Sequence, residues 1–126
     1  MYIPSLSLMS PCTGPPRIFT PPMSQRVVND VDVTFDCYAL VEPVHSLTWY
    51  FVSANGSNTT IGSVNGTEGM TTDSGKYLIT NYTGRAGYGR LLVRAVQFED
   101  RGTYMCLAEN RHGTDPAFAT LSVQGE

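Results

Sequence analysis

The side chains that could perform covalent or metal chemistry are few in this sequence, and their spacing argues against catalysis. Its 126 residues contain three cysteines and two histidines. His45 and His112 lie near predicted turns, and no serine or cysteine has a base at a spacing typical of an activated nucleophile. No Cys/His pair has the spacing of a zinc site. We therefore expect no enzyme activity, no metal site and no cofactor.

Two further patterns are similar to ligand-binding motifs but lack their context. Residues 84–90, Gly-Arg-Ala-Gly-Tyr-Gly-Arg, have the glycine content of a phosphate-binding loop. Predicted strands on both sides, with no helix behind, favour a hairpin turn instead. Asp30, Asp32 and Asp36 are spread along a predicted strand and lack the loop pattern of a calcium site.

Cys37 and Cys106 are placed for a disulfide bond. Each lies on the inward side of a segment whose apolar residues alternate, so a bridge would join two sheets across a core. Closing a loop of about 70 residues stabilises a fold by about 4 kcal/mol in the chain-entropy model. Two buried free thiols are the alternative. Cys12 is the odd cysteine, either a tethering thiol or a linker residue without a partner.

The elements that would position these cysteines are strands. Apolar residues recur with a period of two in five segments, which are 31–39, 47–52, 91–96, 104–109 and 118–123. Clusters of Pro, Gly, Asn and Asp separate these segments, and no window has the spacing of an amphipathic helix. Many short strands between turn signals predict an all-β sandwich or barrel.

Composition excludes several classes of protein. Hydrophobic residues make up 41% and charged residues 15% of the chain, and the net charge is −3. A chain of this length buries roughly two-thirds of its unfolded surface and can form a core without a metal. The charge offers no surface for a nucleic acid backbone, and no apolar run approaches the roughly 18 residues of a membrane span.

The N-terminal segment is unlike the rest, because six of the eight prolines lie in the first 22 residues. Proline lacks the backbone N–H and fixes φ, so residues 1–15 are expected to be an extended lead-in. The folded domain is expected at residues 16–124. The start contains no Lys or Arg and Pro4 interrupts its apolar run, which does not match a signal peptide. We interpret the chain as a domain of a longer protein.

Two aromatic residues accompany the cysteines. Trp49, twelve residues after Cys37 and on the inward side of the next predicted strand, is placed to cover the sulfur atoms. Tyr104, two residues before Cys106, suits a tyrosine corner, in which the hydroxyl binds an upstream backbone group. These spacings favour the disulfide over free thiols.

These residues resemble the immunoglobulin superfamily. Asp100-Arg-Gly102-Thr-Tyr104-Met-Cys106 is similar to its D-x-G-x-Y-x-C motif, and the segment that ends Asn110-Arg-His-Gly113 resembles the C-x-A-x-N-x-x-G of the intermediate (I) set. The resemblance covers about residues 16–124. It implies a sandwich of two antiparallel sheets with Greek-key connections.

The resemblance also implies roles for single residues. Asp100 would pair with Lys76, although Lys76 could instead be solvated. Asn110 and Gly113 would shape the hairpin between strands F and G, where positive φ favours Asn and Gly. The segment between the cysteines is longer than an I-set domain usually has and is nearer to a variable-type domain. The extra length at residues 53–75 leaves room for strand C′ and a strand C″.

Four of the six asparagines head an Asn-x-Ser/Thr acceptor for N-glycosylation. They are Asn55, Asn58, Asn65 and Asn81. The excess indicates a secreted or cell-surface chain whose C′–D edge carries sugar, which agrees with a disulfide formed in an oxidising compartment. A polar loop with coincidental acceptors is the alternative.

An apolar face is predicted on strands C, F and G. Its outward residues are Tyr50, Val52, Met105, Leu107 and Phe118. A patch of this kind on a soluble domain usually marks an interaction surface. We expect it to bind a protein partner or a second copy of the chain, unless the lead-in, strand C′ or a neighbouring domain covers it.

The resemblance implies a non-catalytic recognition module of a cell-adhesion molecule or a receptor ectodomain, including the receptor tyrosine kinase type. Such proteins carry several immunoglobulin domains in tandem, so neighbouring domains and a membrane anchor in the parent chain are expected. The alternative is a structural domain of an intracellular muscle or cytoskeletal filament protein, in which the same I-set signature is common. The four acceptors and the disulfide favour the extracellular class.

Overall fold

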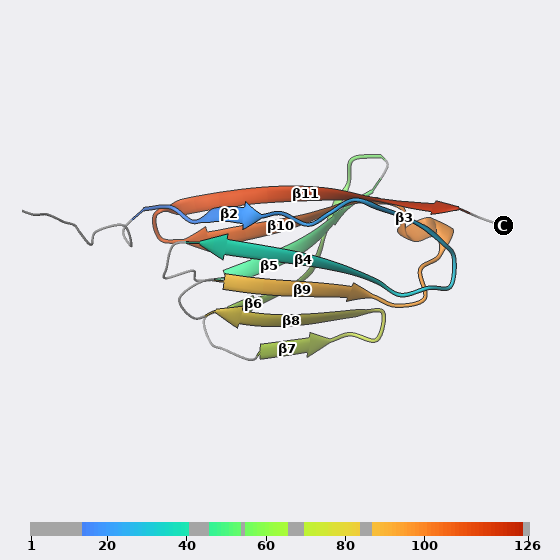
Figure 1. The fold of residues 1–126 in the computed structure, drawn as a ribbon, viewed down its shortest axis with the longest axis horizontal. Coiled ribbons are helices and arrows are strands. Elements are labelled where there is room, and N and C mark those ends of the chain that lie inside the picture. The colour runs from blue at the N-terminus through green and yellow to red at the C-terminus, as the bar shows by residue number, and fades with distance from the viewer. Residues whose placement is uncertain (1–13, 41–45, 54, 66–69, 84–86, 125–126) are drawn as a thin grey trace, which may run out of the picture.

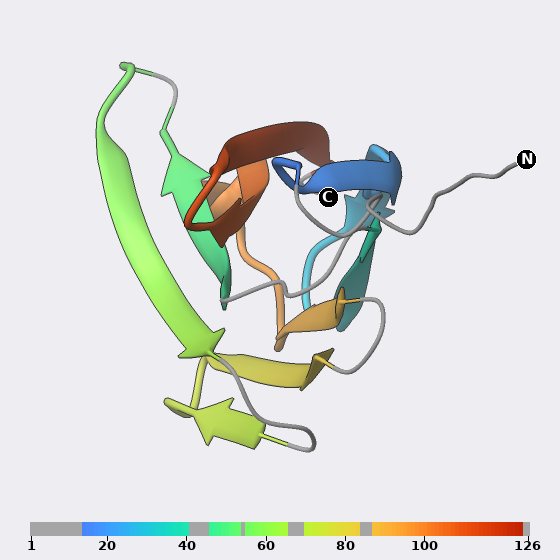
Figure 2. The same cartoon turned by 90° about the vertical axis from the view of Figure 1, so that its left-hand side faces the viewer.

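The computed structural model describes residues 14–40, 46–53, 55–65, 70–83 and 87–124. Apart from one short 3-10 helix, η2 (Phe98–Asp100), the elements of these residues are strands (Figure 1). They form two five-stranded sheets that face each other (Figure 2), so the predicted all-β sandwich is confirmed. No helix in this part of the chain is long and apolar enough to cross a membrane.

The strand order differs between the two sheets. The first sheet has the order β3 (Gln25–Val28), β11 (Gly113–Gln124), β10 (Gly102–Asn110), β5 (Ser46–Val52), β6 (Asn58–Asn65). The second has the order β2 (Arg17–Thr20), β4 (Val33–Leu40), β9 (Gly87–Val93), β8 (Tyr77–Thr83), β7 (Met70–Asp73). Neighbouring strands are antiparallel, except that β3 runs parallel to β11.

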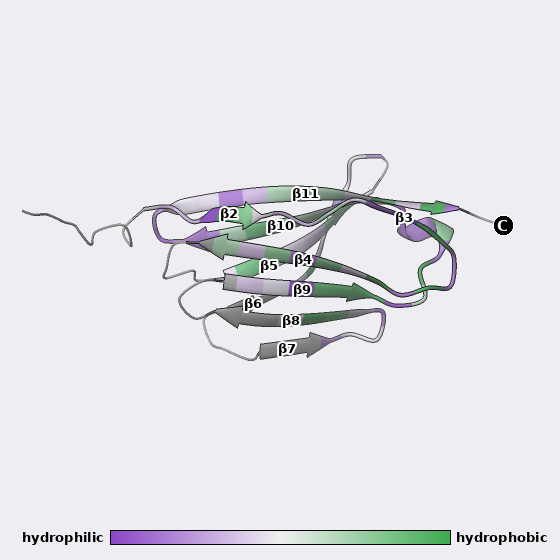
Figure 3. Ribbon diagram, in the orientation of Figure 1, coloured by the Kyte–Doolittle hydropathy of each residue, from purple (hydrophilic) through white to green (hydrophobic). Residues whose placement is uncertain are grey.

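The core lies between the sheets and follows the predicted alternation. Phe35 of β4 stacks on Tyr104 of β10 at 5.0 Å between ring centroids, and Phe51 of β5 lies equally close to Tyr104. In Figure 3 the half of β9 that ends at Val93 is hydrophobic, and Leu91 and Val93 are fully buried there. Period-two alternation places these side chains on one face of each strand, and that face is the one covered by the opposite sheet.

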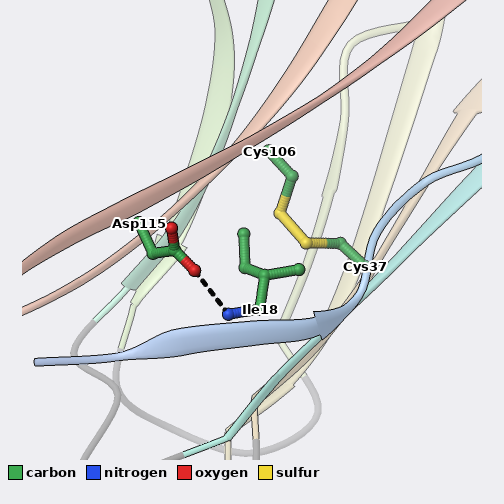
Figure 4. Close-up of a disulfide and its surroundings, with 4 residues drawn as sticks. All are labelled: Ile18, Cys37, Cys106 and Asp115. Carbon is green, nitrogen blue, oxygen red and sulfur yellow. Dashed lines mark hydrogen bonds between the residues drawn. A yellow bond between two sulfur atoms is a disulfide. The ribbon is translucent and has the colours of Figure 1, made fainter.

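A disulfide between Cys37 of β4 and Cys106 of β10 joins the two sheets, with the Cα atoms 6.5 Å apart (Figure 4). The predicted bridge is therefore confirmed. Trp49 is fully buried and lies directly opposite Cys106 in the pairing of β5 with β10. Ile18 packs against the same core, and its side chain points toward the sulfur atoms.

The first strand is divided between the sheets. β2 pairs with β4, and after Pro21 and Pro22 the chain crosses to the other sheet, where β3 pairs with β11. Proline has no N–H to donate, so the ladder with β4 ends where the prolines begin.

The expectation for residues 53–75 holds only in part. β6 pairs with β5 and takes the place of strand C′. β7, however, pairs with β8 in the second sheet, so no described strand lies beyond β6 as a strand C″ would. β6 crosses toward the second sheet and packs against β8 (Figure 2), and a Cβ on Gly62 would lie 2.8 Å from Cδ1 of Ile79. The next strand, β7, pairs with β8 on the side opposite β9.

Candidate interaction face

Three residues of the predicted core signature, Tyr104, Asp100 and Lys76, are joined by a hydrogen bond and an ion pair at the start of β10. The hydroxyl of Tyr104 donates a hydrogen bond to the carbonyl of Asp100 at 2.8 Å, which is the geometry of a tyrosine corner. The Nζ of Lys76 lies 2.7 Å from Oδ2 of Asp100 and 3.2 Å from the carbonyl oxygen of Ala95. Lys76 is thus engaged rather than merely solvated. Burial raises the pKa of Tyr104 far above its usual range.

Gly102 begins β10 at a point where the backbone passes very close to β5. Its φ is +149°, and an added Cβ would lie 2.8 Å from the carbonyl oxygen of Val52. A side chain here would collide with the backbone of β5, so this position requires glycine. The close approach brings β10 and β5 together at the base of the outward face.

The hairpin between β10 and β11 differs from expectation at Asn110. Its φ is not positive, since Asp30 and Ala95 are the non-glycine residues with positive φ in the described part. Instead, the buried Asn110 side chain accepts a hydrogen bond from the N–H of His112 at 2.8 Å and donates one to the carbonyl of Gly14 at 3.1 Å. A polar side chain can fix a turn through its own hydrogen bonds, without a left-handed backbone.

The outward side of the first sheet brings the five predicted partner residues onto one face. Met105 lies directly opposite Tyr50 of β5 and directly opposite Phe118 of β11. Tyr50 in turn lies opposite Thr60 of β6. Residues that oppose each other in antiparallel strands share a face. Tyr50, Met105 and Phe118 therefore form a continuous apolar row across three strands.

The remaining two predicted residues lie in the rows on either side. Leu107 is opposite Thr48 and Pro116, and Val52 is opposite Thr103. Phe118 is 57% exposed, whereas the other four predicted residues are partly buried. Among the outward positions of β5, β10 and β11, Glu109 carries the one charged side chain. We call this surface, defined by Tyr50, Val52, Met105, Leu107 and Phe118, the interaction face.

The glycosylation acceptors lie on β6, on the turn before it and on β8, which is the C′–D edge named above. Asn58 lies opposite Val52, so it shares the side of the sheet that carries the interaction face. Asn55 is exposed in the turn before β6, where its side chain accepts a hydrogen bond from the N–H of Ser57. Asn65 ends β6 and Asn81 lies within β8. A sugar on Asn58 would border the face.

Sequence reasoning missed a second exposed surface, on β2, β4 and β9. Tyr38 stands between Phe19 and Tyr88, with ring centroids 6.1 Å and 4.6 Å away. Next to it, Arg90 Nε lies 2.8 Å from Oδ1 of Asp36. The outward parity of Asp36 and Tyr38 in the sequence was the available signal. In the described residues no three His, Cys, Asp or Glu side chains are grouped as metal ligands would be.

Comparison with known proteins identifies the family. Residues 15–110 match the family model of the immunoglobulin domain. The chain belongs to this family. As an immunoglobulin domain it has strands B, E and D in the sheet of β4, β9 and β8, and strands C, F and G in the sheet of β5, β10 and β11.

Two human proteins are similar in sequence to this immunoglobulin domain. It is 33% identical over 109 residues to human Matrix-remodeling-associated protein 5, covering 86% of this chain and 3% of that protein. It is 30% identical over 117 residues to human Cell adhesion molecule-related/down-regulated by oncogenes, covering 86% and 9%. The chain thus spans less than a tenth of the length of these two relatives.

Solved structures of titin domains have the same fold. The I-band fragment I67–I69 of titin superposes with a TM-score of 0.70 at 26% identity, covering 90% of this chain and 34% of the fragment. Titin M4 superposes with a TM-score of 0.67 at 25% identity, covering 88% and 97%. The chain is therefore an immunoglobulin domain related in sequence to cell-adhesion molecules and similar in fold to titin domains.

Proposed function

We propose that this immunoglobulin domain is a non-catalytic recognition module of an extracellular or cell-surface protein. It binds a protein partner, or a second copy of itself, through the interaction face. The observation that carries the proposal is the in-register row of Tyr50, Met105 and Phe118 on an outward sheet face. A cell-adhesion molecule or a receptor, including the receptor tyrosine kinase type, is the parent protein that fits this role, with neighbouring immunoglobulin domains and a membrane anchor.

The composition of the face supports binding to a protein. Aromatic and Met side chains are enriched at the cores of protein interfaces, and charged residues are depleted there. Phe118 is the most exposed of the five residues, and in many interfaces a few such anchor residues supply most of the affinity, while the contacts around them exclude water. Thr60 beside the row is exposed and Thr103 is partly exposed, which gives the row a polar border.

The extracellular assignment rests on the disulfide and the acceptors. Cys37–Cys106 is closed across the core, and structural disulfides persist in oxidising compartments. Asn55 and Asn58 are exposed, as glycosylation requires. The sequence similarity to cell-adhesion molecules points the same way.

A second candidate function is a structural domain of an intracellular filament protein. The superposition on titin domains favours it, although a fold alone does not fix a function. In a reducing compartment Cys37 and Cys106 would be thiols, and the four acceptors would be unmodified. The intact mass of the protein made in its native host separates the two candidates.

The test has two stages. The protein is isolated from its native host, and the mass of the domain is measured before and after glycosidase, without reduction. We expect glycan mass and two hydrogens fewer than the reduced core domain. Self-association is then followed by sedimentation velocity, and binding of the multimerised domain to a panel of mammalian cells by flow cytometry.

Two matched variants locate the binding surface. Phe118→Asp places a charge in the row, while Phe98→Asp makes the same change at a similarly exposed phenylalanine, 53% against 57%, in η2. We expect Phe118→Asp to lose self-association or cell binding and Phe98→Asp to keep it. Equal behaviour of two folded variants, or an unmodified and reduced native chain, would contradict the proposal.

A further inference from the structure

The edge of β4 is only partly covered. β2 pairs with β4 from Arg17 opposite Leu40 to Thr20 opposite Tyr38, and the chain then leaves for β11 (Figure 1). On its other side β4 pairs with β9 from Val33 to Ala39. In the part of the chain that the structure describes, no strand pairs with residues 33–37 on the side that β2 has left.

The backbone of this edge presents hydrogen-bonding groups to the groove. The Nε2 of Gln25 donates a hydrogen bond to the carbonyl of Thr34 at 2.7 Å, so this carbonyl points to the side that β2 has left. In an antiparallel ladder the N–H and C=O of one residue point to the same side, and the pattern repeats every second residue. The N–H groups of Thr34 and Asp36 therefore point to the same edge as the carbonyl of Thr34, and so does the carbonyl of Asp36.

A groove runs along this edge with a volume of about 390 Å³. The crossover between β2 and β3 forms one wall, and alternate residues of β4 form the other, from Thr34 to Tyr38. The apolar lining includes Pro21, the side chain of Met23, which is 76% exposed, and the ring of Tyr38. An extended chain placed here would continue the line of β2 and contact these side chains.

Asp36 is the one charged residue in the lining of the groove. Its Oδ1 accepts hydrogen bonds from Arg90 Nε at 2.8 Å and from the hydroxyl of Tyr88 at 3.2 Å. Its Oδ2 is held by one longer bond, 3.4 Å from a terminal nitrogen of Arg90. Since the Asp36 side chain is 38% exposed, Oδ2 can accept from an additional cation.

We propose that the free edge of β4 binds an extended peptide segment, which adds to the second sheet as an antiparallel strand beyond Thr20 and places a Lys or Arg against Asp36. Unpaired edge groups of a sheet are templates for strand addition. Main-chain hydrogen bonds would supply the affinity, and the contact with Asp36 would supply selectivity for a basic residue. The site lies on the sheet opposite the interaction face and does not depend on the proposed function.

Gln25 limits access to this edge. Its side chain occupies the carbonyl of Thr34, which an incoming strand would need. This is one exposed hydrogen bond of a side chain, so an N–H of the peptide can replace it at little cost. Natural sheet edges are commonly protected against unwanted pairing, and here the Gln25 side chain blocks one acceptor of the edge. Gln25 thus sets how tightly a peptide is held.

The test uses the whole 126-residue chain and a peptide, acetyl-Thr-Val-Thr-Lys-Thr-Val-Thr-amide. Binding is followed by amide chemical shifts and by hydrogen exchange. We expect the largest changes at the N–H groups of Thr34 and Asp36, with slower exchange of both in the complex. Replacing the Lys of the peptide by Glu should weaken binding at least tenfold. Gln25→Ala should strengthen binding of the Lys peptide several-fold.

Variants of the protein separate strand addition from a simple surface contact. Thr34→Pro removes the edge N–H, and Thr34→Val keeps it with a similar side-chain size; only the proline variant should lose binding. Phe118→Asp should bind the peptide like the parent, because it alters the other sheet. If Thr34→Pro does not fold, protection of the Thr34 and Asp36 amides by the peptide in the parent chain decides.

Three results would overturn this proposal. Equal affinity for the Lys and Glu peptides would remove the role of Asp36, and shift changes centred on β10 and β11 would move the site to the interaction face. A dimer joined through β4 that excludes the peptide would make a second copy the occupant. Loss of peptide binding would leave the proposed function intact, since that function is read from Phe118→Asp in cell binding.

Discussion

The carboxylate of Asp115 accepts a hydrogen bond from the backbone N–H of Ile18 at 2.7 Å (Figure 4). The two residues are 97 positions apart and belong to different sheets, because Ile18 lies in β2 and Asp115 in β11. β2 is only four residues long and two of its described pairs with β4 precede a register shift. The bond therefore fixes the first strand to the body of the domain.

Replacing Asp115 by Ala should destabilise the domain. A hydrogen bond to a charged group contributes about 1.5–3 kcal/mol, and the partly buried N–H of Ile18 would lose its acceptor. Urea unfolding gives the free energy of unfolding. Asp115→Asn keeps an oxygen acceptor and should lose less. An Asp115→Ala variant as stable as the parent would show that the carboxylate is not what holds β2.

The disulfide should account for a large share of the stability. Replacing Cys37 and Cys106 together by Ala removes a bridge across 69 positions, and the chain-entropy model gives a loss of about 4 kcal/mol for such a loop. Cys12→Ala is the matched control and should leave the unfolding midpoint unchanged. A double variant as stable as this control would argue that the bridge adds no stability.

Stability at alkaline pH should depend on Tyr104. Burial raises the pKa of Tyr104 above the usual value of a tyrosine, which applies in the unfolded chain. The stability that the protonated Tyr104 contributes is fully present below about pH 10. It is lost as the pH rises further, because the phenol ionises at a lower pH in the unfolded chain than in the folded domain. Burial also raises the pKa of Tyr77.

Urea midpoints measured from pH 8 to about 11.5 test this dependence. Tyr104→Phe should lose about 0.5–1.5 kcal/mol at pH 8 with its hydrogen bond to Asp100. The urea midpoint of this variant should also fall less steeply above pH 10 than that of the parent, because the variant lacks the phenol whose pKa is raised by burial. Parallel curves for parent and variant would contradict the assignment.

The pair of Asp73 and Arg94 should give the domain a small sensitivity to acid. The side-chain hydrogen bond from Arg94, together with the N–H of Gly75, lowers the pKa of Asp73 to about 2. A lowered pKa in the folded state means that the stabilisation is present above pH 3.8 and is lost between pH 3.8 and about 2.

Side-chain carbon shifts of Asp73 during an acid titration measure this pKa directly. Arg94→Gln should return the pKa toward the ordinary value, because the guanidinium bonds to both carboxylate oxygens. Arg26→Gln removes an exposed arginine elsewhere, on β3, and should leave the pKa unchanged. An Asp73 titration that is the same in both variants would exclude Arg94 as the cause.

The sequence alone was sufficient for five of the ten described strands, for the core and for the disulfide. Period-two alternation is a local property, so it revealed which side of β4 and β10 is buried before any pairing was known. Cys37 and Cys106 could be matched because both lay on that buried side, with Trp49 and Tyr104 at spacings that suit the bridge. The family resemblance added the sandwich topology.

The sheet that a strand joins was decided only by the tertiary structure. β7 could have extended either sheet, and it pairs with β8, the strand that β6 approaches where Gly62 passes Ile79. Asn58 lies on the outward face of its sheet because it pairs with Val52, and this pairing follows a register shift between β5 and β6. Register depends on turns and bulges between strands, and a slip of one residue reverses every side chain.

The interaction face and the free edge of β4 were predictable to different degrees. Alternation could predict that Tyr50, Met105 and Phe118 point outward, but only the pairing of three strands aligns them in one row. The open edge beside Asp36 exists because β2 leaves β4 at Pro21, and nothing in β4 itself signals it. Local sequence determines which side chains a strand exposes, whereas contacts between distant segments determine what those side chains lie beside.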